Sequence, residues 1–137
     1  NDTEHVDVLG INCDIGSNPL KVKESIKENA HNLDVTTYNV TDEKCYIEDL
    51  KGVSDIAEYI NSCANLNNIF VDKKFKYIIF ESKFETYNKP LSILADLKNL
   101  LDYGGIIAIK TSDKSLQLRI KNKSSNAIQS GDWIILK

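Results

Sequence analysis

A glycine-containing loop near the start of the chain is the first segment whose residue types and spacing suggest chemistry. Residues 8–16 read VLGINCDIG, in which an apolar run passes Gly10 and ends at Gly16. Many α/β proteins hold a nucleotide-like cofactor where a strand turns at glycines into a helix, because glycine lets the backbone approach the ligand closely. Asn12 and Asp14 stand inside this turn, so two polar side chains occupy part of the space that such a ligand needs.

Three polar residues at the end of a second apolar run form the other candidate site. Glu81, Ser82 and Glu85 end or follow FKYIIFE, residues 75–81, which predicts a buried strand. Open α/β sheets bind ligands beyond the carboxyl ends of their strands, so these side chains are the candidates for substrate contact. Solvent-exposed loop acids are the alternative interpretation. Catalytic residues stay unassigned, because the sequence contains no P-loop, nucleophile elbow or zinc motif.

The segments that must position these residues alternate between strands and helices. Short runs of aliphatic and β-branched residues predict strands over 5–12, 33–40, 75–81 and 106–111. Apolar residues at helical spacing predict helices that begin at Asn18, Ser54 and Pro90 and end near His31, Ala64 and Gly104. Residues 41–52 predict a turn with a short helix, and residues 67–72 predict a short strand or a connection. Residues 115–123 and 132–137 predict two further strands.

This alternation implies βαβ crossovers, and hence a mostly parallel sheet with helices on both faces. The predicted fold class is therefore α/β, a three-layer Rossmann-like fold with a β-rich C-terminal end. A chain of 137 residues suits one core and no linker divides it, so we expect residues 1–137 to form a single domain. The chain begins with Asn1 and contains no methionine, which indicates a domain excised from a longer protein or a processed N-terminus.

The charge balance argues against nucleic acid or an anionic membrane as a partner. The formal net charge is −3 and Arg119 is the only arginine, so a basic field and bidentate phosphate forks are both missing. No apolar run approaches the roughly 20 residues that a membrane-spanning helix needs. Cys13, Cys45 and Cys63 are odd in number and lack the spacing of a metal site. We therefore expect reduced thiols in a cytoplasmic protein and no bound metal.

Residues 75–110 resemble the second half of the class I S-adenosylmethionine-dependent methyltransferases. In that family a strand of the type FD-V-I leads to a loop that often contains LEH, and a helix then ends in LLKPGG before another apolar strand. Here FET at residues 84–86 occupies the LEH position, and LDYGG at residues 101–105 occupies the end of LLKPGG, without gaps. The resemblance implies the same Rossmann-like fold and strengthens Glu85 as a candidate site residue.

The glycine-containing loop resembles the cofactor loop of the same family, V-L-[DE]-x-G-x-G-x-G, with several departures. Gly10 stands at the acidic position, Asn12 and Asp14 stand at the first two glycines, and Gly16 matches the last glycine. Asn39 falls where family members end the second strand with an acid that holds the ribose hydroxyls. The resemblance implies S-adenosylmethionine as cofactor, with these five residues as its binding set. Each departure weakens that binding, because side chains fill the turn and an amide lacks the charge of a carboxylate.

Two functions follow from the resemblance, and both stay open at this point. The first is a methyltransferase-like domain with an altered or vestigial cofactor site that serves as a non-catalytic module of a larger protein. The second is an active S-adenosylmethionine-dependent methyltransferase that acts on a small molecule or a sugar derivative. A generic nucleotide-binding α/β domain is a third interpretation. The altered glycine loop favours the first function.

The resemblance also implies a biological setting. Domains that resemble this family occur joined to glycosyltransferases and other enzymes of bacterial surface-polysaccharide synthesis. We therefore expect a role in polysaccharide or lipopolysaccharide biosynthesis, with the other domains of a longer parent protein as partners.

Overall fold

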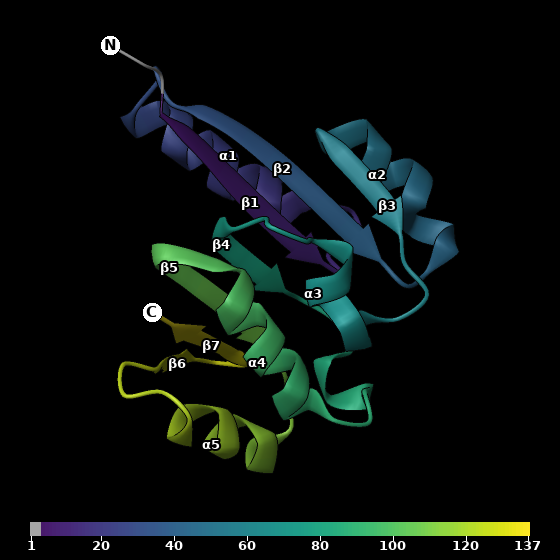
Figure 1. Ribbon diagram of the computed structural model, residues 1–137, viewed down its shortest axis with the longest axis vertical. Helices are drawn as coiled ribbons and strands as arrows, with labels where there is room; N and C mark the ends of the chain where they lie inside the picture. Colours follow the sequence, from purple (N-terminus) through teal and green to yellow (C-terminus); the bar gives the residue numbers. More distant parts are fainter. Residues whose placement is uncertain (1–3) are drawn as a thin grey trace.

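A seven-stranded sheet forms the centre of the computed structural model, which describes residues 4–137 (Figure 1). The strands are β1 (His5–Ile11), β2 (Asp34–Thr41), β3 (Ile56–Tyr59), β4 (Phe75–Phe80), β5 (Leu101–Lys110), β6 (Ile128–Ser130) and β7 (Trp133–Leu136). Their order across the sheet is β3-β2-β1-β4-β5-β7-β6. The first five strands pair in parallel, and β7 runs antiparallel to both β5 and β6. The mostly parallel α/β fold with a β-rich C-terminal end is therefore confirmed.

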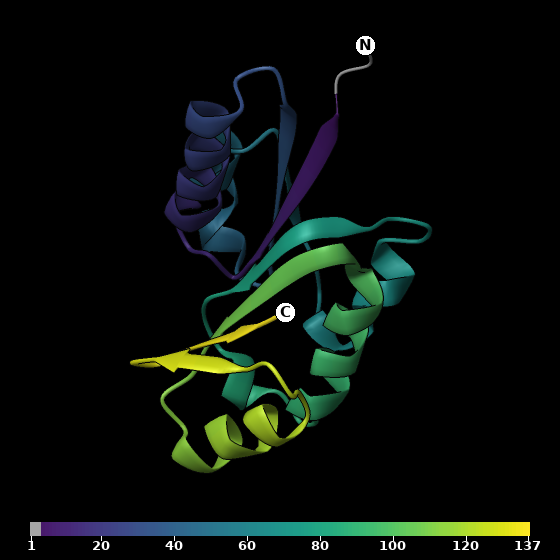
Figure 2. The same cartoon turned by 90° about the vertical axis from the view of Figure 1, so that its left-hand side faces the viewer.

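Helices cover both faces of this sheet. The helix α1 (Ser17–Asn29) and the short α2 (Ile47–Val53) lie on one face, and α3 (Leu66–Ile69), α4 (Pro90–Leu100) and α5 (Lys114–Asn122) lie on the other (Figures 1 and 2). Three single turns of 3-10 helix, at 44–46, 63–65 and 84–86, lie in the connections. The arrangement gives the three layers that the alternation of strands and helices predicts.

The larger part of the core lies between the sheet and the helices α3, α4 and α5. Phe75, Phe80 and Phe84 are fully buried there, and the rings of Phe80 and Phe84 meet edge to face with centroids 5.1 Å apart. Burying an aromatic or aliphatic side chain of this size contributes about 1.5–3 kcal/mol. A smaller cluster beneath α1 contains Val8 and Ile79. Central strands with two apolar faces explain the continuous apolar runs of β1, β4 and β5.

The prediction of a strand over residues 115–123 is wrong, because this segment forms α5. The side chain of Asp113 caps the helix by accepting a hydrogen bond from the backbone N–H of Leu116 at 3.1 Å. Leu116 and Ile120 are four residues apart and are both buried against the core. The alternating apolar residues also fit a strand, but the cap and the buried stripe at helical spacing favour the helix.

The predicted helix from Ser54 is also wrong, because β3 occupies its first half. The helix in this region, α2, ends before Ser54 and lies in the segment for which a short helix was expected. The carboxylate of Asp55 accepts hydrogen bonds from the backbone N–H of Thr37 at 2.8 Å and from Lys23 at 2.9 Å, which fastens the start of β3 beside β2. Residues 67–72 form no strand, since α3 ends at Ile69.

Two predicted helix ends differ from the structure. Helix α1 begins at Ser17 after a left-handed Gly16, and Asn18 donates a hydrogen bond to Glu81 at 2.7 Å instead of capping the helix. Helix α4 ends at Leu100, and the segment up to Gly104 belongs to β5. Gly104 has a positive φ of 71°, next to a shift in the register between β4 and β5. The two glycines of the LDYGG segment therefore shape an irregular strand.

We expect Gly10→Ala to destabilise the protein and Gly52→Ala to stabilise it. A Cβ at Gly10 would lie 2.3 Å from Asn39 Oδ1 and 2.5 Å from Pro19 Cγ, so the neighbours must move. Overpacking of this kind costs about 1–3 kcal/mol. A Cβ at Gly52 in α2 would meet nothing within 4 Å, and alanine favours a helix over glycine by about 0.5–1 kcal/mol. Urea unfolding of both variants measures the two changes, and equal effects would contradict this account of Gly10.

Candidate functional site

The loops that follow β1, β2 and β4 meet at one edge of the sheet and enclose a hollow of about 260 Å³, which we call the strand-end crevice. It is lined by Asn12, Asp14, Thr41, Glu43, Tyr46, Ser82 and Lys83. Open α/β sheets bind ligands at this edge. The crevice is small, since pockets for small molecules usually measure about 300–1,000 Å³.

The side chain of Asn12 forms part of the wall of the strand-end crevice. Its Nδ2 donates hydrogen bonds to the Tyr87 hydroxyl at 2.8 Å and to the backbone carbonyl of Ser82 at 3.2 Å. Its Oδ1 accepts one from the backbone N–H of Asp42 at 3.1 Å. Asn12 is buried and has a positive φ of 51°, a conformation that asparagine adopts more readily than most residues. One amide therefore joins the loops after β1, β2 and β4.

An acidic residue directly after β2 is held by two further side chains. The ammonium of Lys83 lies 3.0 Å from Asp42 Oδ1 and also pairs with Glu43, and the Tyr87 hydroxyl donates a hydrogen bond to Asp42 Oδ2. Lys83 has a positive φ of 72°, which is unfavourable for its side chain, and the two acids hold it there. We call Asn12, Asp42, Glu43, Lys83 and Tyr87 the crevice network.

The protonation states of the crevice network follow from these contacts. Hydrogen bonds to Glu43 and then to Asp42 raise the pKa of the Lys83 ammonium, so it stays charged. Burial, followed by the hydrogen bond to Asp42, raises the pKa of the Tyr87 hydroxyl well above its usual range, so it stays neutral. The Sγ of Cys63 lies 3.3 Å from this hydroxyl, and burial raises the pKa of that thiol to about 11. The Tyr87 hydroxyl and the Cys63 thiol are therefore both protonated near neutral pH, and neither is available as a base or a nucleophile.

The two glycines predicted to face a cofactor are packed against the chain itself. A Cβ at Gly16 would lie 2.7 Å from Val53 Cγ2 in α2, and the neighbours of Gly10 are Asn39 and Pro19. The amide of Asn39 lies beneath α1, where its Nδ2 donates to the Ser54 hydroxyl at 2.7 Å. Asn39 Oδ1 has no hydrogen-bond partner among residues 4–137. Asp14 lines the strand-end crevice, so of this predicted set only Asn12 and Asp14 lie at its wall.

The three residues predicted to contact a substrate lie together at a second hollow of about 280 Å³ beyond β4 and β5. Ser82 lines both hollows. The carboxylate of Glu85 accepts a hydrogen bond from the Thr111 hydroxyl at 2.6 Å, and that of Glu81 accepts one from Asn18 at 2.7 Å. Their role stays a prediction, but the structure brings them beside the strand-end crevice.

Asp42, Lys83 and Tyr87 were not among the site residues predicted from the sequence. Only Asp42 carried a signal, because it is an acid close to the end of the second predicted strand, three positions after the Asn39 to which the ribose-binding position was assigned. The other two depend on contacts with Asp42 across 41 and 45 positions of the chain.

Residues 4–137 also bear on metal binding and on membrane insertion. No group of three or more histidine, cysteine or acidic side chains in this range is placed to hold a metal ion. None of the helices described is both long and apolar enough to cross a membrane.

Comparisons with known proteins support the fold. No family model matches the chain, and no curated protein matches it either. Solved structures do match. The citrinin polyketide synthase CMeT domain has a TM-score of 0.71 and 8% sequence identity over 99% of this chain. The plantazolicin methyltransferase BamL, in complex with SAH and a triazolic desmethylPZN analog, has a TM-score of 0.60 and 19% identity over 88%.

A third match is precorrin 8W decarboxylase from Methanobacterium thermoautotrophicum, with a TM-score of 0.65 and 11% identity over 98% of this chain. The chain spans 81% of that protein, but only 43% of BamL and 47% of the CMeT domain. At these identities the likeness is one of fold alone. The protein therefore has the α/β fold of the S-adenosylmethionine-dependent methyltransferases.

Proposed function

We propose that this chain is a methyltransferase-like domain whose cofactor site is closed by its own side chains, and that it serves as a non-catalytic module of a larger protein. The observation that supports the proposal is the buried amide of Asn12, which lines the strand-end crevice and is already hydrogen-bonded to Tyr87 and Ser82. The residues present do not fit S-adenosylmethionine as the family loop would hold it. Protein atoms fill the space beside Gly10 and Gly16, and Asp42, the acid after β2, is already paired with Lys83.

The energetic argument concerns what a ligand must displace. A nucleoside that took the space of the Asn12 side chain would have to move it, and one that bound Asp42 would have to separate this carboxylate from Lys83. Each buried polar group left without a partner costs about 1–3 kcal/mol. A total penalty of about 2.8 kcal/mol weakens binding a hundredfold. The ligand escapes this penalty only if its own polar atoms replace every bond that it breaks.

An active methyltransferase acting on a small molecule or a sugar derivative is the second candidate. The hollow at Glu81, Ser82 and Glu85 favours it, because a substrate there would lie directly beside the strand-end crevice. BamL, which shares the fold, was solved with SAH. Methyl transfer depends mainly on holding two reactants in line, so the absence of an assigned base does not argue against it.

The setting of the domain follows from the length comparison and the family resemblance. The chain spans less than half of BamL and of the CMeT domain, which is consistent with a module of a longer protein. We propose the other parts of that protein as partners and the cytoplasm as location. A role in bacterial polysaccharide or lipopolysaccharide biosynthesis, beside a glycosyltransferase, rests on the resemblance alone.

We expect no rise in melting temperature when the protein is mixed with S-adenosylmethionine or S-adenosylhomocysteine at about 1 mM. This concentration is near the upper end of the usual range of Michaelis constants. A ligand at about 100 times its dissociation constant would stabilise the folded state by about 2.7 kcal/mol, which thermal unfolding detects easily. A saturable rise that disappears in Asp42→Asn would contradict the proposal and favour the active enzyme. A rise with NAD or a nucleotide sugar, and none with the methyl donor, would favour a generic nucleotide-binding domain.

Thiol labelling tests whether the crevice network is closed in solution. Cys45 is exposed, whereas Cys13 and Cys63 are buried, and burial also raises the pKa of both buried thiols. With a maleimide or a disulfide reagent at pH 7, we expect Cys45 alone to react in the folded protein. Tyr87→Phe removes the hydroxyl that is hydrogen-bonded to Asn12 and Asp42. If this loss lowers the free energy that favours the closed crevice by about 1.4 kcal/mol, Cys63 should be labelled roughly tenfold faster.

The rate at Cys45 is the internal control, because that residue is exposed in both proteins. Labelling is followed by mass spectrometry of the separate peptides. Rapid reaction of Cys63 in the unaltered protein would show that the crevice opens freely, against the proposed closure.

A further inference from the structure

Half of one sheet face has no helix over it. On the side where α1 and α2 lie, α1 packs on β1 and β2, and no helix of residues 4–137 covers β5 and β7 (Figure 2). We call the apolar surface on this side of β4, β5 and β7 the open half-face. Its side chains are Tyr77, Ile106, Ala108, Trp133 and Ile135, and the buried Ile79 of the cluster beneath α1 borders it.

The strand register makes the open half-face continuous. Tyr77 pairs with Ile106, and Ala108 lies between Ile79 on one side and Ile135 on the other. Ile107 and Ile109 alternate with these residues along β5 and are fully buried on the opposite face. Ile106 and Ala108 are only half-buried. A sheet usually buries both apolar faces, so this half is built to be covered.

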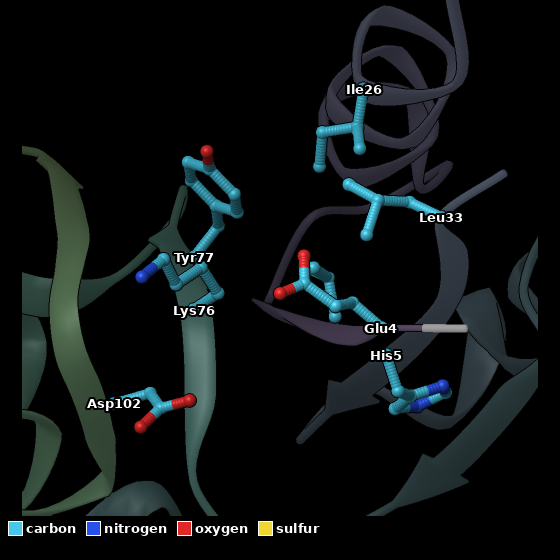
Figure 3. Close-up of a pocket in the computed structure, with 8 residues that line it drawn as sticks. Glu4, His5, Ile26, Leu33, Lys76, Tyr77 and Asp102 are labelled. Carbon is cyan, nitrogen blue, oxygen red and sulfur yellow. The ribbon is translucent and has the colours of Figure 1, made fainter. Parts of the chain in front are cut away.

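A hollow of about 410 Å³ adjoins the open half-face at the amino ends of the strands. Ile26, Leu33 and Tyr77 give it apolar walls. Glu4, just before β1, and Asp102, in β5, also line it (Figure 3). Neither carboxylate has a lysine, arginine or histidine partner among the residues that the structure describes. The hollow therefore offers two negative charges beside an apolar surface.

The nearest cation of the chain is already engaged elsewhere. The Lys76 ammonium donates a hydrogen bond to the backbone carbonyl of Tyr103 at 2.8 Å, and Figure 3 shows it directed away from the hollow. The ring of His5 also turns away from it and bonds to Asp7 and Asp34. Among residues 4–137, the carboxylate of Asp102 accepts a hydrogen bond only from the backbone N–H of Tyr103, at 2.8 Å, so a positive group from a partner would complement both charges.

We propose that the open half-face docks an amphipathic helix whose apolar stripe covers β5 and β7 and whose end places a lysine or arginine between Glu4 and Asp102. A helix fits the space, because β1 and β7 are three strand spacings apart, or about 14 Å, and a helix with side chains is about 10 Å wide. An added strand does not fit, since β4 and β5 already pair on both sides. This inference is independent of whether the strand-end crevice binds a nucleoside.

Selection from a displayed library of random 18-residue peptides (about 27 Å long as helices) tests the proposal. The target is the folded domain, and Ala108→Arg, which puts a charge on the open half-face, is the counter-target. We expect enriched peptides with apolar residues three and four apart and a basic residue near one end. Enrichment without that pattern, or equal binding to Ala108→Arg, would overturn the assignment.

The only tryptophan of the chain lies on the open half-face and reports binding directly. Saturating peptide should shift the emission of Trp133 to shorter wavelength. Glu4→Gln combined with Asp102→Asn should weaken a selected basic peptide at least tenfold, and both positions are exposed, so folding is preserved. Leu118→Arg, at an exposed apolar position on α5, is the matched control and should leave the affinity unchanged.

Two results would refute the proposed occupant. The first is an affinity that does not change in the double variant, because the basic residue would then have no partner. The second is a shift of Trp133 emission with protein concentration alone, which would indicate that a second copy of the domain covers the face.

Discussion

The buried amide of Asn12 is the interaction on which the arrangement of the site depends. A buried amide usually has partners for both its donors and its acceptor, because an unpaired group costs more than a hydrogen bond contributes. The partners of Asn12 come from Asp42, Ser82 and Tyr87, which lie in the loops after β2 and β4. One side chain thus fixes the distance between three loops. A ligand at the same edge would have to supply the same set of hydrogen bonds.

The two motif glycines show what a sequence motif can and cannot establish. A glycine in such a loop indicates that something approaches the backbone closely, but the motif does not say what approaches. At Gly16 the approaching group is Val53, and at Gly10 it is Pro19 together with Asn39. The loop therefore keeps the geometry of strand, turn and helix while protein atoms occupy the clearance. The fold of the family and the chemistry of the family depend on different atoms of the same motif.

Most of the sheet was predictable from sequence, because its central strands are buried on both faces and read as continuous apolar runs. The failures lie where the local pattern fits two structures. Residues 115–123 alternate as a strand does, and only the Asp113 cap and the buried Leu116 decide for a helix. The edge strand β3 is short and largely exposed, so it lacks a burial pattern. In the site, the partners of Asp42 are separated from it by more than 40 positions, and no local signal connects them.

The two ends of the sheet differ in how completely their polar groups are paired. At the carboxyl ends, the ammonium of Lys83 pairs with both Asp42 and Glu43, and burial keeps the Tyr87 hydroxyl uncharged. At the amino ends, Glu4 and Asp102 face a hollow that opens onto apolar side chains. Apolar area removed from water contributes about 25 cal/mol per Å², and a cation enclosed between two carboxylates adds specificity more than affinity. A ligand at the open half-face therefore covers side chains that no helix of residues 4–137 covers, whereas a ligand at the crevice that contacts Asn12 or Asp42 competes with their present hydrogen bonds.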